Sequence, residues 1–289
     1  MNWLAKISIT CFAASYLVVF AIALLRVYLP QVYTRRSTVW SAIKIGFAVA
    51  GFFAHTVFLG YHTNLSFDQS GLWFGSWFGW SLAGAWLLAA AYLWLVYQKF
   101  NSSIGLFLLP VVLGLIGWGT WVGSESVFTA DREKTIWNMV HGVSLLLGTA
   151  VVALGFVFGV MFLVHARRLK SKSVSASGQF RLPSLEWLQQ QTERSLFVSA
   201  ICLGFGLLSG IALNLTSTVE GIVIPWKDPV IWTSGALFGW LVFAVLGSQF
   251  YRPVRSGRKV AMLVLFSCLF LMIELGIAWW FGHGTGVSS

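Results

Sequence analysis

The sequence is poor in charged residues, which make up only 10% of its 289 positions. Soluble domains carry roughly 25% charged residues, so these charges are too few to cover a soluble protein of this size. Hydrophobic residues reach 57% and come in long runs. Runs of about 20 residues match the thickness of the hydrocarbon core. The composition therefore excludes a sizeable soluble domain and predicts a single transmembrane domain over residues 1–289.

Acidic residues are scarcer than basic ones: nine Asp and Glu stand against 19 Lys and Arg, for a net charge of +10. In a soluble protein this excess would suggest nucleic acid, but here the basic residues sit in short loops between apolar runs. We expect membrane lipid and no nucleic acid as the partner. The loops after the first, third, fifth and seventh runs hold 15 of the 19, which predicts that these loops are cytoplasmic and both termini are outer, or periplasmic. The 15 are Arg26, Arg35, Arg36, Lys44, Lys99, Arg167, Arg168, Lys170, Lys172, Arg181, Arg194, Arg252, Arg255, Arg258 and Lys259.

Cysteine is also rare, with Cys11, Cys202 and Cys268 each inside an apolar run and no Cys-x-x-Cys pair. This pattern argues against a disulfide framework or a thiol relay and favours small buried residues. The sequence lacks a Ser–His–acid elbow, a Walker loop, a dinucleotide fingerprint and zinc-ligand spacing. No catalytic residue is therefore indicated.

The fold class that follows is all-α: a polytopic membrane protein with about eight transmembrane helices, since runs this long must satisfy their own backbone hydrogen bonds in lipid. The first run is too long for a typical signal peptide, so we expect a retained helix. Gly204, Gly206 and Gly210 favour close helix approach. Ser184 is a candidate N-cap for a short interfacial helix within residues 182–188, leading into the sixth span. The predicted spans are 7–29, 39–61, 72–97, 103–123, 139–166, 195–217, 229–250 and 259–282.

Four of the five histidines fall in the predicted outer half of the membrane: His55, His62, His141 and His283; His165 falls at a solvated cytoplasmic end. The tryptophans share the outer bias, at 11 of 16. Imidazole is a common axial ligand of haem iron, and aromatic walls suit a porphyrin. His141 and His283 form the best axial pair, because each sits at a helix end on the outer face. The alternative is that these residues are polar anchors and an aromatic belt.

His55 lies about two turns deeper than His62, so it could serve a second site within the bilayer or bond a neighbouring helix. Glu274 lies about two turns before His283, at a depth where a carboxylate is costly and usually functional or paired. Its candidate roles are to bond a histidine, to orient a propionate-binding group or to carry a proton. A protonated, hydrogen-bonded packing role is equally compatible with the sequence.

Four segments resemble the cytochrome c assembly family, the CcsA, CcmC and HemX group. The loop Ile-Pro-Trp-Lys-Asp-Pro-Val-Ile-Trp at 224–232 is similar to that family's tryptophan-rich WWD signature. The segments Met-Val-His-Gly at 139–142, Pro-Ser-Leu-Glu at 183–186 and Trp-Phe-Gly-His-Gly-Thr-Gly at 280–286 follow in the family's order. The resemblance covers about residues 40–286, and the short loops look most like the HemX and YpjD-like branch.

The resemblance implies haem handling in cytochrome c biogenesis: transport or presentation of haem b at the outer face of a bacterial inner membrane. By position, His141 and His283 would be the axial ligands of the iron, Trp226, Asp228 and Trp232 the platform beside the porphyrin, and His55 the histidine of the site where haem enters. A ResB-like partner and apocytochrome c would complete a haem-attachment system. The alternatives are a HemX-type regulatory or scaffold protein without haem delivery, and a proton-coupled small-molecule transporter that uses Glu274.

Overall fold

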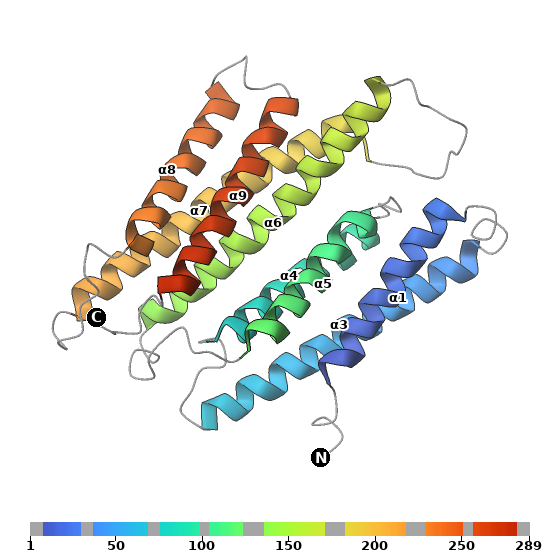
Figure 1. Ribbon diagram of the computed structural model, residues 1–289, viewed down its shortest axis with the longest axis horizontal. Helices are drawn as coiled ribbons and strands as arrows, with labels where there is room; N and C mark the ends of the chain where they lie inside the picture. The colour runs from blue at the N-terminus through green and yellow to red at the C-terminus, as the bar shows by residue number, and fades with distance from the viewer. Residues whose placement is uncertain are drawn as a thin grey trace. The chain divides into compact units, whose positions relative to one another are not determined.

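All of the secondary structure in the described part of the chain is helical (Figure 1). The computed structural model describes residues 8–29, 37–68, 76–98, 104–123, 136–170, 183–217, 229–250 and 257–281. Within them lie eight helices, each long and apolar enough to cross a membrane. The all-α, polytopic prediction is confirmed to this extent, while the orientation of the termini stays a prediction. The helices are α1 (Ile9–Tyr28), α3 (Ser37–Asp68), α4 (Trp77–Tyr97), α5 (Ile104–Val122), α6 (Ile136–Lys170), α7 (Leu185–Ser217), α8 (Pro229–Phe250) and α9 (Gly257–Phe281).

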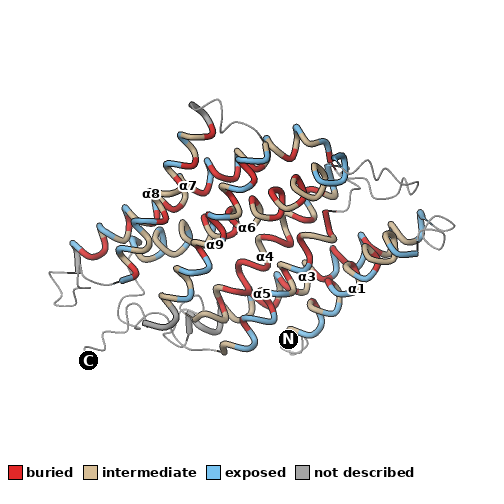
Figure 2. Tube along the Cα trace, turned by 45° about the horizontal axis from the view of Figure 1, so that its top comes forward, coloured by how far each residue is buried: buried red, intermediate tan, exposed pale blue. Residues whose placement is uncertain are grey.

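Exposed positions on these helices are often large and apolar, as expected for lipid-facing surfaces. Leu17 on α1, Phe53 on α3, Phe205 on α7 and Phe266 on α9 are each more than half exposed. Figure 2 shows exposed and buried residues following one another along the helices. Such widespread apolar exposure is rare on soluble proteins, so the surface supports the same conclusion as the hydropathy.

The contacts divide the chain into two compact units. Unit 1 is Met1–Ser124 with His165–Ser184, and unit 2 is Glu125–Val164 with Leu185–Ser289. Long helix α6 therefore contributes to both. The prediction of one transmembrane domain over 1–289 stays a prediction.

In unit 1, α1, α3, α4 and α5 pack as a ring, with contacts between α1 and α3, α3 and α4, α4 and α5, and α5 and α1. Small residues bring the helices together. A Cβ added at Gly51 of α3 would lie 2.9 Å from Cβ of Ser15 on α1. Phe12 and Tyr16 on the same face of α1 are almost fully buried.

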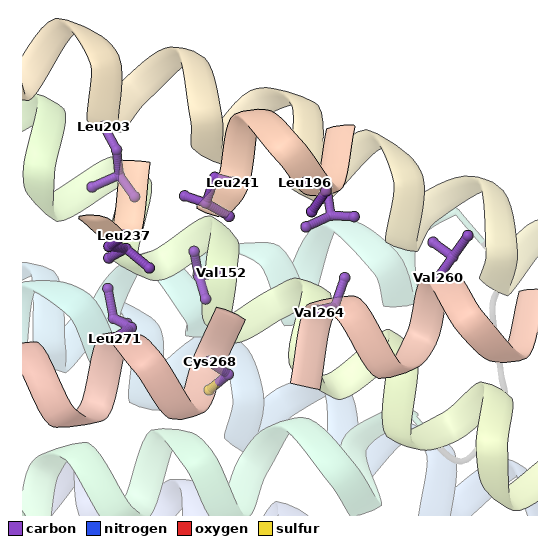
Figure 3. Close-up of a cluster of buried hydrophobic side chains, with 10 residues drawn as sticks. Val152, Leu196, Leu203, Leu237, Leu241, Val260, Val264, Cys268 and Leu271 are labelled. Carbon is purple, nitrogen blue, oxygen red and sulfur yellow. The ribbon is translucent and has the colours of Figure 1, made fainter. Parts of the chain in front are cut away.

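In unit 2, α7, α8 and α9 contact one another, and α6 packs on α7 and α9 through its glycines. Their buried side chains form one apolar cluster (Figure 3). Leu203, Leu237 and Leu271 gather towards one end of the cluster. Val260 of α9 lies towards the other end.

The glycines of α7 behave as the sequence predicts. A Cβ on Gly206 would lie 2.6 Å from Leu145 Cδ2 of α6, and one on Gly204 would lie 3.0 Å from the Phe238 ring of α8. A Cβ on Gly210 would lie 3.0 Å from Cε1 of the His141 ring on α6. Close approach of α6 and α8 to α7 is confirmed, because only a hydrogen fits at these positions.

Several boundaries differ from the predicted ones. Helix α7 begins at Leu185, so the short interfacial helix expected within 182–188 and the sixth span are one continuous helix. The polar first turns of α7 are stabilised as helix because Leu188 is fully buried and the Trp187 ring packs edge-on against Phe158 of α6. Helix α3 continues to Asp68, so His62 lies within the helix rather than just beyond it.

The cysteines are free thiols, and their burial differs. Cys268 is buried in the cluster of unit 2, and Cys202 is half-buried. Cys11 is exposed near the start of α1, so the expectation of a buried residue is wrong there. An exposed position on a membrane helix suits a small apolar side chain equally well, because lipid replaces protein as its surroundings.

Candidate functional site

Three of the six predicted haem-site residues lie in the described part of the chain. His141 and Trp232 belong to unit 2, and His55 belongs to unit 1. The predicted positions of Trp226, Asp228 and His283 lie outside the described residues. The described part of the candidate site is therefore His141 and its surroundings.

His141 lies in the second turn of α6 and points at the backbone of α7. Its Nδ1 lies 2.7 Å from the carbonyl oxygen of Gly206. A carbonyl only accepts, so Nδ1 carries the hydrogen and donates it. In the neutral ring the lone pair is then at Nε2. The bond across the helices therefore sets both the tautomer and the direction of the imidazole.

The glycines of α7 make this bond geometrically feasible. Gly210, one turn after Gly206, has its hydrogen facing Nδ1 and Cε1 of His141, so this edge of the ring lies close to α7. The same Gly206 carbonyl accepts a second hydrogen bond from Ser209 Oγ at 2.8 Å. A larger residue at Gly210 would crowd the ring, and one at Gly206 would collide with Leu145 of α6. The Gly206–Gly210 stretch is thus a cradle for His141.

Trp232 lies at the same level of unit 2 as this cradle. Helices α7 and α8 are antiparallel, and Gly204 faces Phe238 between them. Six residues further along α7 is Gly210, and six residues back along α8 is Trp232. The structure therefore brings His141 and Trp232 into one layer of the helix bundle. The two side chains come from different helices.

Trp232 stands on an open, apolar hollow. Its side chain is 72% exposed, and Ile231, Trp232, Gly235 and Ala236 line a cavity of about 500 Å³. These residues lie on the side of α8 away from its buried Leu237 and Leu241. The volume lies in the range of cavities that hold small molecules and cofactors, which are typically lined by apolar and aromatic residues. A flat apolar ligand would find an aromatic wall here.

Glu274 of α9 accepts a hydrogen bond from Ser234 Oγ of α8, next to the hollow in sequence. Its partner is thus a hydroxyl on a neighbouring helix, which agrees with the packing role considered for it. A second interhelical bond, from Trp240 Nε1 to Ser267 Oγ at 3.0 Å, joins α8 and α9 further along. Polar side chains therefore fix α8 against α9 at two levels, and one of them is close to the Trp232 layer.

His55 has a different environment, inside unit 1. It is fully buried, its ring stacks on Phe12 at 4.2 Å, and Nδ1 lies 3.4 Å from the Tyr16 hydroxyl. Within the described residues Nε2 meets no partner with hydrogen-bond geometry, although the backbone of Leu82 in α4 is beside the ring. Of the two roles considered, contact with a neighbouring helix is observed. The second haem site stays a prediction.

The other two described histidines bond locally or not at all. His62 Nδ1 donates to the Phe58 carbonyl one turn earlier at 3.2 Å, and the His62 and Phe58 rings stack. His165 was expected to be solvated. It is half-buried near the end of α6, and its buried Nδ1 has no hydrogen-bond partner among the described residues, so its solvation stays a prediction.

Metal binding by a cluster of side chains finds no support in the described residues, where no group of three or more His, Cys, Asp or Glu could hold an ion. Haem iron needs only one or two protein ligands, and His141 fits that requirement. Histidine ligands of metals usually donate their other ring N–H to a carbonyl or carboxylate, which orients the ring. The bond to Gly206 is of this kind.

Comparison of the chain with protein-family models, with curated proteins and with solved structures finds no match.

Sequence reasoning missed two features of these sites. Tyr16, the partner of His55, and the Gly206 carbonyl, the partner of His141, both depend on helix register. A glycine four residues before another on a membrane helix was the only signal for the second.

Proposed function

We propose that this protein binds haem at the layer of unit 2 that contains His141 and Trp232, and that it holds or moves haem in cytochrome c biogenesis. The observation that supports the proposal most is the bond from His141 Nδ1 to the Gly206 carbonyl. It leaves the lone pair of the neutral ring at Nε2, the atom that would coordinate iron. The resemblance in residues 139–142 and 224–232 supports the same assignment.

His141 would act as one axial ligand, and the cradle of Gly206 and Gly210 would hold its ring in the ligating orientation. Trp232 would cover part of one porphyrin face from α8, and the apolar hollow beside it would exclude water. His283 is proposed as the second ligand, with Trp226 and Asp228 beside the porphyrin. Haem supplies the iron and the flat apolar surface; a partner would have to supply the apocytochrome cysteines.

The direct test is the visible absorption spectrum of the purified protein, before and after haem supplementation. We expect a Soret band in the wild type and loss or displacement of that band in His141→Ala. His165→Ala is the matched control, because it removes an imidazole from the other end of the same helix, and its band should be unchanged. Absence of a Soret band from the supplemented wild type would refute haem binding.

Two further variants define the site. Trp232→Ala should weaken haem retention during gel filtration, whereas Trp94→Ala, an exposed tryptophan of unit 1, should not. His283→Ala should change the band as His141→Ala does. An identical spectrum in all of these variants would favour the regulatory or scaffold alternative, which requires no haem.

A further inference from the structure

The end of unit 1 at which α1 finishes and α3 begins contains a cluster of hydrogen-bond donors. Lys44 of α3 is only 7% exposed. Trp40, one turn earlier on the same side of α3, has a buried Nε1–H that lacks a hydrogen-bond partner in the described residues. Buried donors are normally satisfied, so an unpaired indole N–H one turn from a buried lysine indicates a missing acceptor.

A second cation lies at the same level. Tyr16 of α1 meets His55 of α3, and the two helices run in opposite directions from that contact. Arg26 is ten residues after Tyr16, and Lys44 is eleven residues before His55, so the two basic residues lie at the same level of the helix pair. They are near enough for the charge of Arg26 to act on Lys44. An anion beside two like charges would offset their repulsion.

Unit 1 has almost no negative charge with which to neutralise Lys44. Residues 1–124 and 165–184 contain a single acidic residue, Asp68. It is at the far end of α3, 24 residues from Lys44, or roughly 36 Å along the helix. The counter-charge must therefore come from outside the unit.

The surroundings indicate that a lipid supplies it. Tyr28 at the end of α1 is 75% exposed, and Ile45, Phe47 and Val49 around Lys44 are each more than 40% exposed. Apolar side chains beside basic ones are the arrangement that meets a phospholipid at the membrane boundary, with acyl chains on the former and the headgroup on the latter. Free phosphate has no apolar part that could contact these exposed apolar side chains.

We propose that Arg26, Trp40 and Lys44 form a binding site for the headgroup of an anionic phospholipid. Lys44 and Arg26 balance the phosphate charge, and the Trp40 indole donates a hydrogen bond to one of its oxygens. The site does not depend on haem binding, since it lies in unit 1 and uses none of the residues assigned to haem.

The test uses purified, delipidated full-length protein in detergent, with thermal unfolding as the readout. Phosphatidylglycerol, phosphatidylcholine and inorganic phosphate are added separately. We expect phosphatidylglycerol to raise the melting temperature several degrees more than phosphatidylcholine, and phosphate to have little effect. Equal shifts from the two lipids would overturn the proposal, and an equal shift from free phosphate would overturn the headgroup assignment.

Variants locate the effect. Lys44→Gln should at least halve the difference between the two lipids, Lys44→Arg should keep it, and Trp40→Phe should reduce it by a smaller fraction. Each shift is measured from the variant's own lipid-free melting temperature, so a change in basal stability does not hide the result. Lys259→Gln and Trp94→Phe, at exposed positions elsewhere, serve as controls. A full lipid difference in Lys44→Gln would refute the site.

Discussion

The two units each hold a histidine against a neighbouring helix, and they do so in opposite ways. His55 in unit 1 is fully enclosed by aromatic rings and meets a hydroxyl, which can donate or accept. His141 in unit 2 is half-buried and meets a carbonyl, which can only accept. The hydroxyl leaves the tautomer of His55 open, whereas the carbonyl fixes that of His141. The first environment encloses the ring in the core, and the second fixes the orientation of a half-buried ring.

The largest expected difference between the two histidines comes from removing each ring. His55→Ala should lower the free energy of unfolding by about 3 kcal/mol, because it leaves a cavity beside Phe12 and Tyr16. His141→Ala should cost only about 1 kcal/mol, for one interhelical hydrogen bond and partial packing. Unfolding in mixed SDS micelles, followed by tryptophan fluorescence, measures both. Equal losses would contradict the division into an enclosed core residue and a half-buried one.

The glycine cradle provides the next largest effect. Gly206→Val should destabilise the protein by about 2 kcal/mol, because its side chain would collide with Leu145 and break the His141 bond. Gly239→Val on α8 is the matched control, since a Cβ there meets nothing within 4 Å. Its unfolding free energy should change by less than about 0.5 kcal/mol. A similar loss in both variants would mean that the contact of Gly206 with α6 does not decide the result, since valine has a higher helix propensity than glycine.

In the described part of each unit an indole donates to a hydroxyl on a neighbouring helix, which allows a matched pair of variants. Trp86 donates to Thr56 Oγ1 at 2.8 Å in unit 1, and Trp240 donates to Ser267 Oγ in unit 2. Trp86→Phe and Trp240→Phe should each cost about 0.6–1 kcal/mol of unfolding free energy. Thr56→Val and Ser267→Ala remove the same bonds from the other side. In each double variant the losses should fall short of the sum of the singles, and simple additivity would argue against the bond.

Glu274→Gln should have the smallest effect on stability, below about 0.5 kcal/mol, because the amide oxygen can still accept from Ser234. The same variant separates haem binding from proton-coupled transport. We expect an unchanged Soret band. Abolition of substrate uptake into vesicles, with the histidines dispensable, would favour the transporter.

The eight spans could be predicted because length and hydropathy alone decide which segments can cross a membrane. The start of α7 could not, since Gln189 and Thr192 lower the hydropathy without ending the helix. Thr192 is buried, and its hydroxyl donates a hydrogen bond to the Leu188 carbonyl one turn earlier in the same helix. Lys44 similarly counts as a loop charge in the sequence but lies buried in α3.

The candidate site was only partly predictable. The position of His141 near a helix end and the small size of Gly206 and Gly210 are visible in the sequence. Their meeting depends on the register between α6 and α7, which a hydropathy profile does not contain. The interactions of Tyr16 with His55 and of Ser234 with Glu274 are missing from the prediction for the same reason.

Helix α7 is an uninterrupted rod of 33 residues, roughly 50 Å long. One end is polar, with Glu193 accepting from Gln189, and the other carries the cradle for His141. Because an α-helix resists both bending and unwinding, a rotation of the polar end of α7 would also move the Gly206 carbonyl, to which the imidazole is bonded. A protein that binds residues 186–194 could therefore change the orientation of the ring without entering the membrane.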